Sequence, residues 1–246
     1  MDIVTIAAVA VAFLAGGAVK GVVGLGLPTV SLAILSTVLG LHEALPLSVV
    51  PAFLTNVWQG VYGGQFRSIL KRFWSLFLLS CLGVGLGSLV LVRADPGLMN
   101  AALGAMLGLY ALVGLSDVRF RVPAKNEFYL TPLAGLVTGT VAGATGTMAI
   151  PSVPYMQALG LDKDALVQAM GILFASSTLA LGLALAGHRV FAPEAFVLSS
   201  LALIPTMIGM YLGQLWRTRI SAEAFRRWLF FCLLVLGLHL AWKGLA

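Results

Sequence analysis

A single lysine inside an apolar segment is the residue whose type and position most strongly indicate chemistry. Lys20 follows 17 uncharged residues and precedes 21 more. Burying an ammonium group in a bilayer costs several kcal/mol unless the group is paired or hydrated, so an intramembrane lysine indicates a functional site. No acidic residue is nearby in the sequence, and a transported anion would be a suitable partner. The alternative is that Lys20 lies near the end of its segment and reaches the membrane surface.

Two glycine-rich interruptions give a second reason to expect an anion. Each half of the chain has one, marked by glycines and a following proline: Gly21, Gly24, Gly26 and Pro28, then Gly139, Gly143, Gly146 and Pro151. A helix that restarts within the membrane presents unpaired N–H groups and the positive end of its dipole. Proline suits the first turn of such a helix because its missing N–H would have lacked a partner anyway. Two such N-termini facing each other would form a pocket for a small oxyanion.

Hydroxyl and amide side chains at matching depth in the two halves are candidates to line this pocket. Ser and Thr in membrane helices also bond their own backbone. Glycines at four-residue spacing, such as Gly17 and Gly21, let helices pack closely without binding anything. We favour packing for the individual glycines and the pocket for the paired breaks. The predicted substrate-binding residues are Lys20, Gly24, Gly26, Pro28, Thr29, Asn56, Gln59, Gly143, Thr145, Gly146, Thr147, Pro151, Ser176, Ser177 and Thr178.

Residues for catalysis or metal binding are not found in a suitable pattern. The nine acidic residues all lie in or beside loops, so no intramembrane carboxylate pair is available. His239 stands alone in the last apolar segment, and Cys81 and Cys232 form no CxxC or Cys/His cluster. We expect both cysteines to be buried, and we expect no catalytic residue, no metal and no cofactor.

The elements that must position these residues are membrane helices. Of the 246 residues, 60% are hydrophobic and 10% are charged, with a mean hydropathy of +1.01, whereas soluble domains carry about 25% charged residues. The sequence predicts an all-α polytopic membrane protein with ten helical segments, of which the second and seventh are too short to span a bilayer. The segments are residues 3–22, 28–40, 44–63, 73–92, 98–116, 129–144, 148–160, 165–186, 195–215 and 225–243.

The order of matching residues predicts an internal duplication. Three sets match, the first two at an offset of 120 and the third at 126: Gly26 with Gly146; Leu39-Gly40-Leu41 with Leu159-Gly160-Leu161; Gly83, Gly87 and Arg93 with Gly209, Gly213 and Arg219. The predicted parts are residues 1–118 as the first repeat, 119–127 as a cytoplasmic linker and 128–246 as the second repeat. Each repeat would hold a glycine-broken or re-entrant helix pair followed by three transmembrane helices.

The basic loops predict the orientation. By the positive-inside rule, three loops should be cytoplasmic: Arg67, Lys71 and Arg72; Arg119, Arg121 and Lys125; Arg217, Arg219, Arg226 and Arg227. The turn at 162–164 is the one acidic connection that this scheme leaves on the same side. Each repeat crosses the membrane an odd number of times, so the second repeat starts on the opposite side from the first. The repeats would therefore be inverted, as in many secondary transporters, and both termini would lie outside. The net charge of +6 lies in these loops, so we expect lipid rather than nucleic acid as the partner.

The glycine motifs resemble those of a known family. The stretches Lys20-Gly21-Val22-Val23-Gly24-Leu25-Gly26-Leu27-Pro28 and Gly139-Thr140-Val141-Ala142-Gly143-Ala144-Thr145-Gly146-Thr147 with Pro151 resemble the TauE/SafE family of membrane transporters over essentially the whole chain. The commoner family pattern has three glycines in a row before the proline, where this chain has Gly26 between two leucines.

The resemblance implies a function and a location. It implies export of sulfite, sulfoacetate or a related organosulfonate across the bacterial cytoplasmic membrane, with a small anion as the substrate. The alternatives are a transporter of another small organic anion and a non-transporting scaffold whose glycine faces bind partner helices. Whether the chain acts as a monomer or a homodimer is left open by the sequence.

Overall fold

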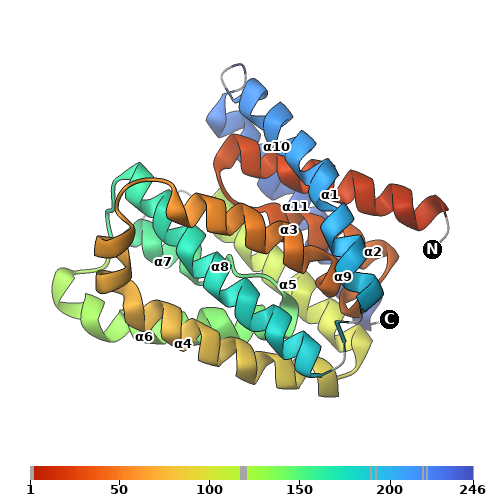
Figure 1. Cartoon of the computed structure of the whole chain (residues 1–246), viewed down its shortest axis with the longest axis horizontal. Helices are drawn as coiled ribbons and strands as arrows, with labels where there is room; N and C mark the ends of the chain where they lie inside the picture. The colour runs from red at the N-terminus through yellow and green to blue at the C-terminus, as the bar shows by residue number, and fades with distance from the viewer. Residues whose placement is uncertain are drawn as a thin grey trace. The chain divides into compact units, whose positions relative to one another are not determined.

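Every regular element of the described chain is an α-helix (Figure 1). The computed structural model describes residues 3–116, 121–188, 190–191, 193–217, 219 and 221–245. The helices are α1 (Ile3–Val23), α2 (Leu27–Val38), α3 (Leu41–Val61), α4 (Phe66–Arg93), α5 (Pro96–Leu115), α6 (Ala124–Thr145), α7 (Ser152–Ala158), α8 (Lys163–Gly187), α9 (Pro193–Leu201), α10 (Leu203–Trp216) and α11 (Ala222–Leu245). The predicted all-α class is confirmed. Arg119 and the start of the predicted linker, residues 119–120, lie outside the described residues.

Seven stretches of helix in the described residues are long and apolar enough to cross a membrane. They are α1, α3, α4, α5, α8, α9 together with α10, and α11. The glycine- and threonine-rich α6 is not one of the seven. The two elements that were expected to be short are short, with 12 residues in α2 and 7 in α7. The chain is therefore a multi-pass membrane protein.

Four predicted segments differ from the helices that form; one is the seventh, expected over residues 148–160 and observed as Ser152–Ala158. The fourth begins at Phe66 rather than 73, and the sixth at Ala124 rather than 129, because helices continue past the apolar run into charged residues that are themselves good helix formers. The ninth is interrupted at Ala202 and becomes α9 and α10. Pro205 explains this break, since it has no N–H to donate to the carbonyl of Leu201 four residues earlier.

Asp162 has a structural reason to be in the acidic turn before α8. It is the N-cap of that helix, and its Oδ1 accepts hydrogen bonds from the backbone N–H groups of Asp164 (3.1 Å) and Ala165 (2.8 Å). Carboxylates are favoured at helix N-termini because they bond the free N–H groups and complement the dipole. The acidic turn is thus a helix start, whichever side of the membrane it faces.

The helices form two compact units, and each unit takes segments from both halves of the chain. Unit 1 comprises Met1–Pro51, Ala94–Asp117 and Val190–Ala246, and unit 2 comprises Ala52–Arg93 and Val118–Arg189. Helix α3 contributes its first part to unit 1 and its second part to unit 2.

In unit 1, α1 packs against α10, and α5 packs against α11 (Figure 1). Glycines bring these backbones together. A Cβ added at Gly17 or Gly21 of α1 would lie well inside 3.0 Å of a carbonyl oxygen of α10, and one added at Gly209 or Gly213 of α10 would meet α1 in the same way. Small residues allow this approach in membranes, where close van der Waals packing drives helix association.

A proline gap in α3 is filled by a side chain from α9, also in unit 1. Pro51 has no N–H to donate to the carbonyl of Leu47, four residues earlier. The Ser199 hydroxyl donates to that Leu47 oxygen at 2.8 Å, and its oxygen accepts the N–H of Val50 at 3.0 Å. One buried serine therefore satisfies the backbone groups beside the proline.

In unit 2, α4 packs along α6 and also contacts α8 (Figure 1). Gly135, Gly139 and Gly143 of α6 face the backbone of α4, while Gly83 and Gly87 of α4 face that of α6. An added Cβ at any of the five would lie well inside 3.0 Å of a carbonyl oxygen on the other helix. Glycines at four-residue spacing on α6 therefore serve close helix packing, as at Gly17 and Gly21 of α1.

The two units share a pairing pattern that agrees with a duplication. The first helix of each predicted repeat, α1 or α6, packs against the fourth segment of the other repeat, which is α10 or α4. In two of the matched glycine pairs both residues have positive φ: +100° and +73° at Gly26 and Gly146, and +79° and +67° at Gly40 and Gly160. The inverted direction of the repeats stays a prediction.

Candidate functional site

The break between α1 and α2 is made by two glycines in left-handed conformation. Gly24 has φ +87° and Gly26 has φ +100°, values that cost other residues roughly 1–2 kcal/mol. The Gly24 N–H donates to the Lys20 carbonyl at 2.7 Å and ends α1. Gly26 is the N-cap of α2 and supplies no side-chain cap, while Pro28 lies in the first turn, as predicted. The start of α2 thus presents backbone N–H groups without a capping side chain.

Lys20 lies in the last turn of α1, directly before this break. Its side chain is only 4% exposed, which argues against the interpretation that it extends out of the protein. The negative end of the α1 dipole favours a cation at this position and offsets part of the cost of burial. Thr29, in the first turn of α2, is also buried. Unit 1 therefore holds a buried lysine, a hydroxyl and an uncapped helix start within ten residues of sequence.

The break between α6 and α7 has a different chemistry. Gly146 ends α6 with φ +73°, and its N–H donates to the Ala142 carbonyl at 2.7 Å. The buried hydroxyls nearby are those of Thr145, Thr147 and Ser152. Thr145 donates to Val141 within its own helix, and Ser152 donates to the Met148 carbonyl. Among the described residues, this break offers hydroxyl groups and no basic side chain.

The seventh element provides less than the sequence predicted. Helix α7 has 7 residues, and Pro151 is its N-cap rather than part of its first turn. The N–H groups of Val153 and Tyr155 already donate to Ala149 and Pro151. A helix of under two turns carries only a weak dipole, so α2 has the stronger of the two N-termini.

The three hydroxyl residues of α8 have three different surroundings. Thr178 is directed at the break, with its Oγ1 3.8 Å from Met148 Sδ. Ser177 shares a hydrogen bond of 2.8 Å with Ser80 of α4, and Ser176 donates to Leu173 in its own helix at 3.0 Å. Of the three, Thr178 is therefore the one placed to line a site at the α6–α7 break.

The predicted residues of α3 lie in unit 2, and one of them, Gln59, bonds to α8. The Gln59 amide donates to the Val167 carbonyl at 2.7 Å, and Asn56 is buried. Gln168, which the sequence analysis missed, donates to the Gly60 carbonyl at 2.9 Å and accepts the Gln65 N–H at 3.0 Å. The signal in the sequence was a single glutamine within a predicted apolar helix, which indicates a polar contact inside the protein.

The structure divides the predicted site residues between the two units. Unit 1 brings together one set and unit 2 the other: Lys20, Gly24, Gly26, Pro28 and Thr29; then Asn56, Gln59, Gly143, Thr145, Gly146, Thr147, Pro151, Ser176, Ser177 and Thr178. Within unit 2, Gly143 faces the backbone of α4, and Gln59 is bonded to α8. Gly143 therefore packs α6 against α4, and Gln59 joins α3 to α8.

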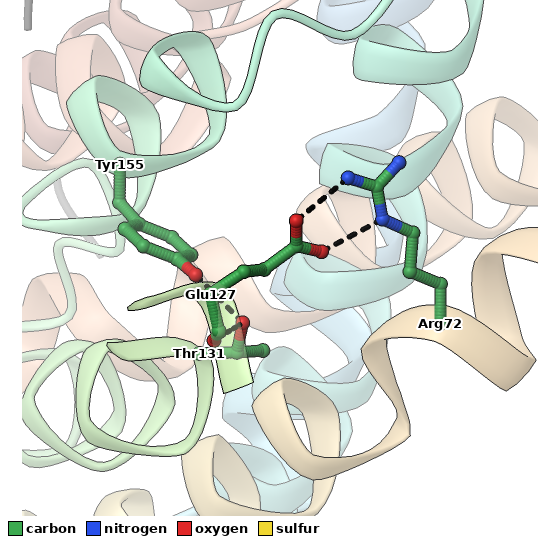
Figure 2. Close-up of polar contacts among 4 residues, drawn as sticks. All are labelled: Arg72, Glu127, Thr131 and Tyr155. Carbon is green, nitrogen blue, oxygen red and sulfur yellow. Dashed lines mark hydrogen bonds and ion pairs between the residues drawn. The ribbon is translucent and has the colours of Figure 1, made fainter. Parts of the chain in front are cut away.

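A polar cluster at the start of α6 was also missed by the sequence analysis (Figure 2). The Arg72 guanidinium of α4 binds the Glu127 carboxylate through two hydrogen bonds of 2.7 and 2.9 Å. The Thr131 hydroxyl bonds the Glu127 carbonyl and the Tyr155 hydroxyl, each at 2.6 Å. The cluster therefore ties α7 and α4 to the first turns of α6.

Metal ligands do not gather anywhere in the described residues: no three His, Cys, Asp or Glu side chains lie close enough to share an ion. The expectation that both cysteines are buried is wrong for Cys232, which is exposed on α11, and Cys81 is half-buried. The exposed residues near Cys232 on α11 include Val235 and Leu238 as well as His239.

Comparison with known proteins identifies the family. The family model described as sulfite exporter TauE/SafE matches residues 8–240. No curated protein and no solved structure matches the chain. The match runs from α1 into α11 and includes both glycine breaks and Lys20. The chain belongs to the sulfite exporter TauE/SafE family, which implies a membrane exporter of sulfite or sulfur anions rather than an enzyme.

Proposed function

We propose that this chain is a secondary transporter that exports sulfite, sulfoacetate or a related organosulfonate across the cytoplasmic membrane by alternating access. The observation that carries the proposal is Lys20, a buried cation beside the uncapped start of α2. A sulfur oxyanion would neutralise the ammonium group and accept hydrogen bonds from the free N–H groups. Within unit 2, the hydroxyl-lined break with Thr147 and Thr178 would supply neutral hydrogen-bond donors to an anion.

The membrane potential can drive this export. A cell interior that is negative by ~100 mV favours the exit of each negative charge by ~2.3 kcal/mol. A divalent anion therefore needs no coupled ion to leave. The proposed orientation places the basic loops in the cytoplasm and both termini outside.

The scaffold alternative receives less support from the packing. It requires glycine faces that are free to bind partner helices. Gly17, Gly21, Gly135, Gly139 and Gly143 instead face helices of the same chain. Those faces are already occupied, so the family and the buried cation favour transport.

The test is efflux of sulfite from liposomes that contain the purified protein and carry an imposed potential. We expect Lys20→Gln to slow efflux about 10- to 100-fold, because a hydrogen bond to a charged group contributes ~1.5–3 kcal/mol. Lys20→Arg should keep more activity, since it retains the charge. Lys243→Gln is the matched control, because Lys243 is an exposed lysine of the same unit that bonds the Thr37 carbonyl.

A different result would contradict each part of the proposal: the site, the substrate class and the driving force. Activity of Lys20→Gln equal to that of the unmodified protein would remove Lys20 from the site. Transport of other organic anions in preference to sulfite and sulfonates would mean that the substrate class is wrong. Efflux that ignores the potential and needs a pH gradient would contradict the uncoupled mechanism.

A further inference from the structure

The start of α4 and the start of α6 concentrate positive charge on the exposed surface of unit 2. Five exposed basic residues lie in residues 66–74 and 121–131, which contain a single acidic residue, Glu127. The basic residues are Arg67, Lys71, Arg72, Arg121 and Lys125. Glu127 forms its ion pair with Arg72 (Figure 2). The charges of Arg67, Lys71 and Lys125 have no acidic partner among the described residues.

The first two turns of α4 are amphipathic in three directions. Helical spacing sorts the residues into a buried face, an exposed apolar face and an exposed basic face: Ile69 and Phe73; Phe66, Leu70 and Trp74; Arg67 and Lys71. The backbone at Phe73 is not helical (φ −112°, ψ 19°), so a kink separates these turns from the apolar remainder of α4. Basic and apolar faces side by side are typical of helices that lie at a membrane surface.

Helix α6 extends this surface. Lys125 is exposed in its first turn, and the exposed rings of Phe128 and Tyr129 follow, with centroids 5.2 Å apart. The two helix starts are neighbours, because Arg72 of α4 and Glu127 of α6 are directly bonded (Figure 2). Aromatic side chains at a membrane–water boundary sit at the level of the lipid headgroups.

We propose that the α4–α6 basic surface, defined as Arg67, Lys71 and Lys125, binds the headgroup phosphate of an anionic phospholipid. The complementary charge selects an anion, and the exposed rings of Phe66, Trp74 and Phe128 place that anion at headgroup depth rather than in open water. Basic clusters beside membrane helices bind anionic lipids in this way. This lipid site is separate from the proposed transport function and does not depend on it.

The test compares lipids that differ only in headgroup charge. The unfolding temperature of the purified full chain, in an uncharged detergent, is followed as phosphatidylglycerol or phosphatidylcholine with the same acyl chains is added. We expect phosphatidylglycerol to raise the unfolding temperature at a lower concentration than phosphatidylcholine does. Added salt should reduce this difference between the two lipids. Arg67→Gln with Lys71→Gln should weaken the apparent affinity for phosphatidylglycerol roughly 30-fold, since each basic residue near an anionic surface contributes about fivefold.

Two further variants control for charge and folding. Arg67→Lys with Lys71→Arg keeps both charges and should bind normally. Arg226→Gln with Arg227→Gln removes two charges that already lie beside Glu223, at 3.8 and 3.0 Å, and should change the affinity by less than about fivefold. An unchanged unfolding temperature without lipid shows that a variant is folded.

Several outcomes would overturn the proposal. These are equal effects of the two lipids on the unmodified protein, equal loss in both glutamine double variants, and an equal effect of inorganic phosphate. The effect of salt on phosphatidylglycerol binding is measured on the unmodified protein, so it tests the proposal even if a variant does not fold. Binding that salt does not weaken would contradict the proposal.

Discussion

Gly139→Ala tests how closely α4 and α6 must approach. An added Cβ would lie well inside 3.0 Å of the Ser80 carbonyl oxygen, 2.7 Å from its carbon and 2.8 Å from its Cα. Because the obstruction is backbone and cannot rotate away, α4 must move outward along this contact. The Ser80 hydroxyl also bonds Ser177 of α8 at 2.8 Å, so the movement would stretch a second contact.

The expected loss follows from three terms. Overpacking of a tight contact costs ~1–3 kcal/mol, and the weakened hydrogen bond costs about 1 kcal/mol more. Alanine returns about 1 kcal/mol through its higher helix propensity. We therefore expect Gly139→Ala to lower the free energy of unfolding by roughly 1–3 kcal/mol, measured by titration of mixed micelles with sodium dodecyl sulfate and followed by circular dichroism.

Gly85→Ala is the matched control on α4. An added Cβ there has no heavy atom within 4 Å, so the substitution should leave stability unchanged or raise it by up to ~1 kcal/mol. If Gly139→Ala proved as stable as Gly85→Ala, the close packing of α4 on α6 would be refuted.

Three other substitutions probe separate contacts. Ser199→Ala should cost roughly 1–3 kcal/mol, because it leaves the backbone groups beside Pro51 unpaired; the same titration measures it. Glu127→Gln should cost up to about 1 kcal/mol by loss of the charge paired with Arg72, and the difference in unfolding temperature from the unmodified protein should shrink at high salt. Gly26→Ala should cost ~1–2 kcal/mol through its left-handed backbone and should slow sulfite efflux, whereas unchanged efflux would separate that bend from transport.

The membrane class and the two breaks were predictable because their causes are local. Apolar runs of sufficient length specify spanning helices, and positive φ at Gly24, Gly26 and Gly146 is a conformation that glycine adopts without strain. The burial of Lys20 also followed from its uncharged flanks. In these places the sequence neighbours of a residue determine its environment.

The packing partners were not predictable, because they depend on helices far apart in the chain. The spacing of Gly17 and Gly21 indicated a packing face, but the neighbouring residues in the sequence do not indicate that α10 is the helix packed against it. The same holds for Gln59, because nothing local predicts its hydrogen bond to a carbonyl of α8. The break at Ala202 had a local signal in Pro205 that hydropathy alone conceals, because the residues on both sides of it are equally apolar.

The pairing of α1 with α10 also sets an order for biogenesis. The last residue of α1 is synthesised about 180 residues before the first residue of α10. Every segment of unit 2 has been synthesised once Arg189 is made, whereas unit 1 still lacks α10 and α11. Unit 2 can therefore assemble during translation, while α1 remains in the bilayer without its final partner. Termination before Leu203 would leave α1, which carries Lys20, without α10, and we expect such a fragment to be a substrate for quality-control proteolysis.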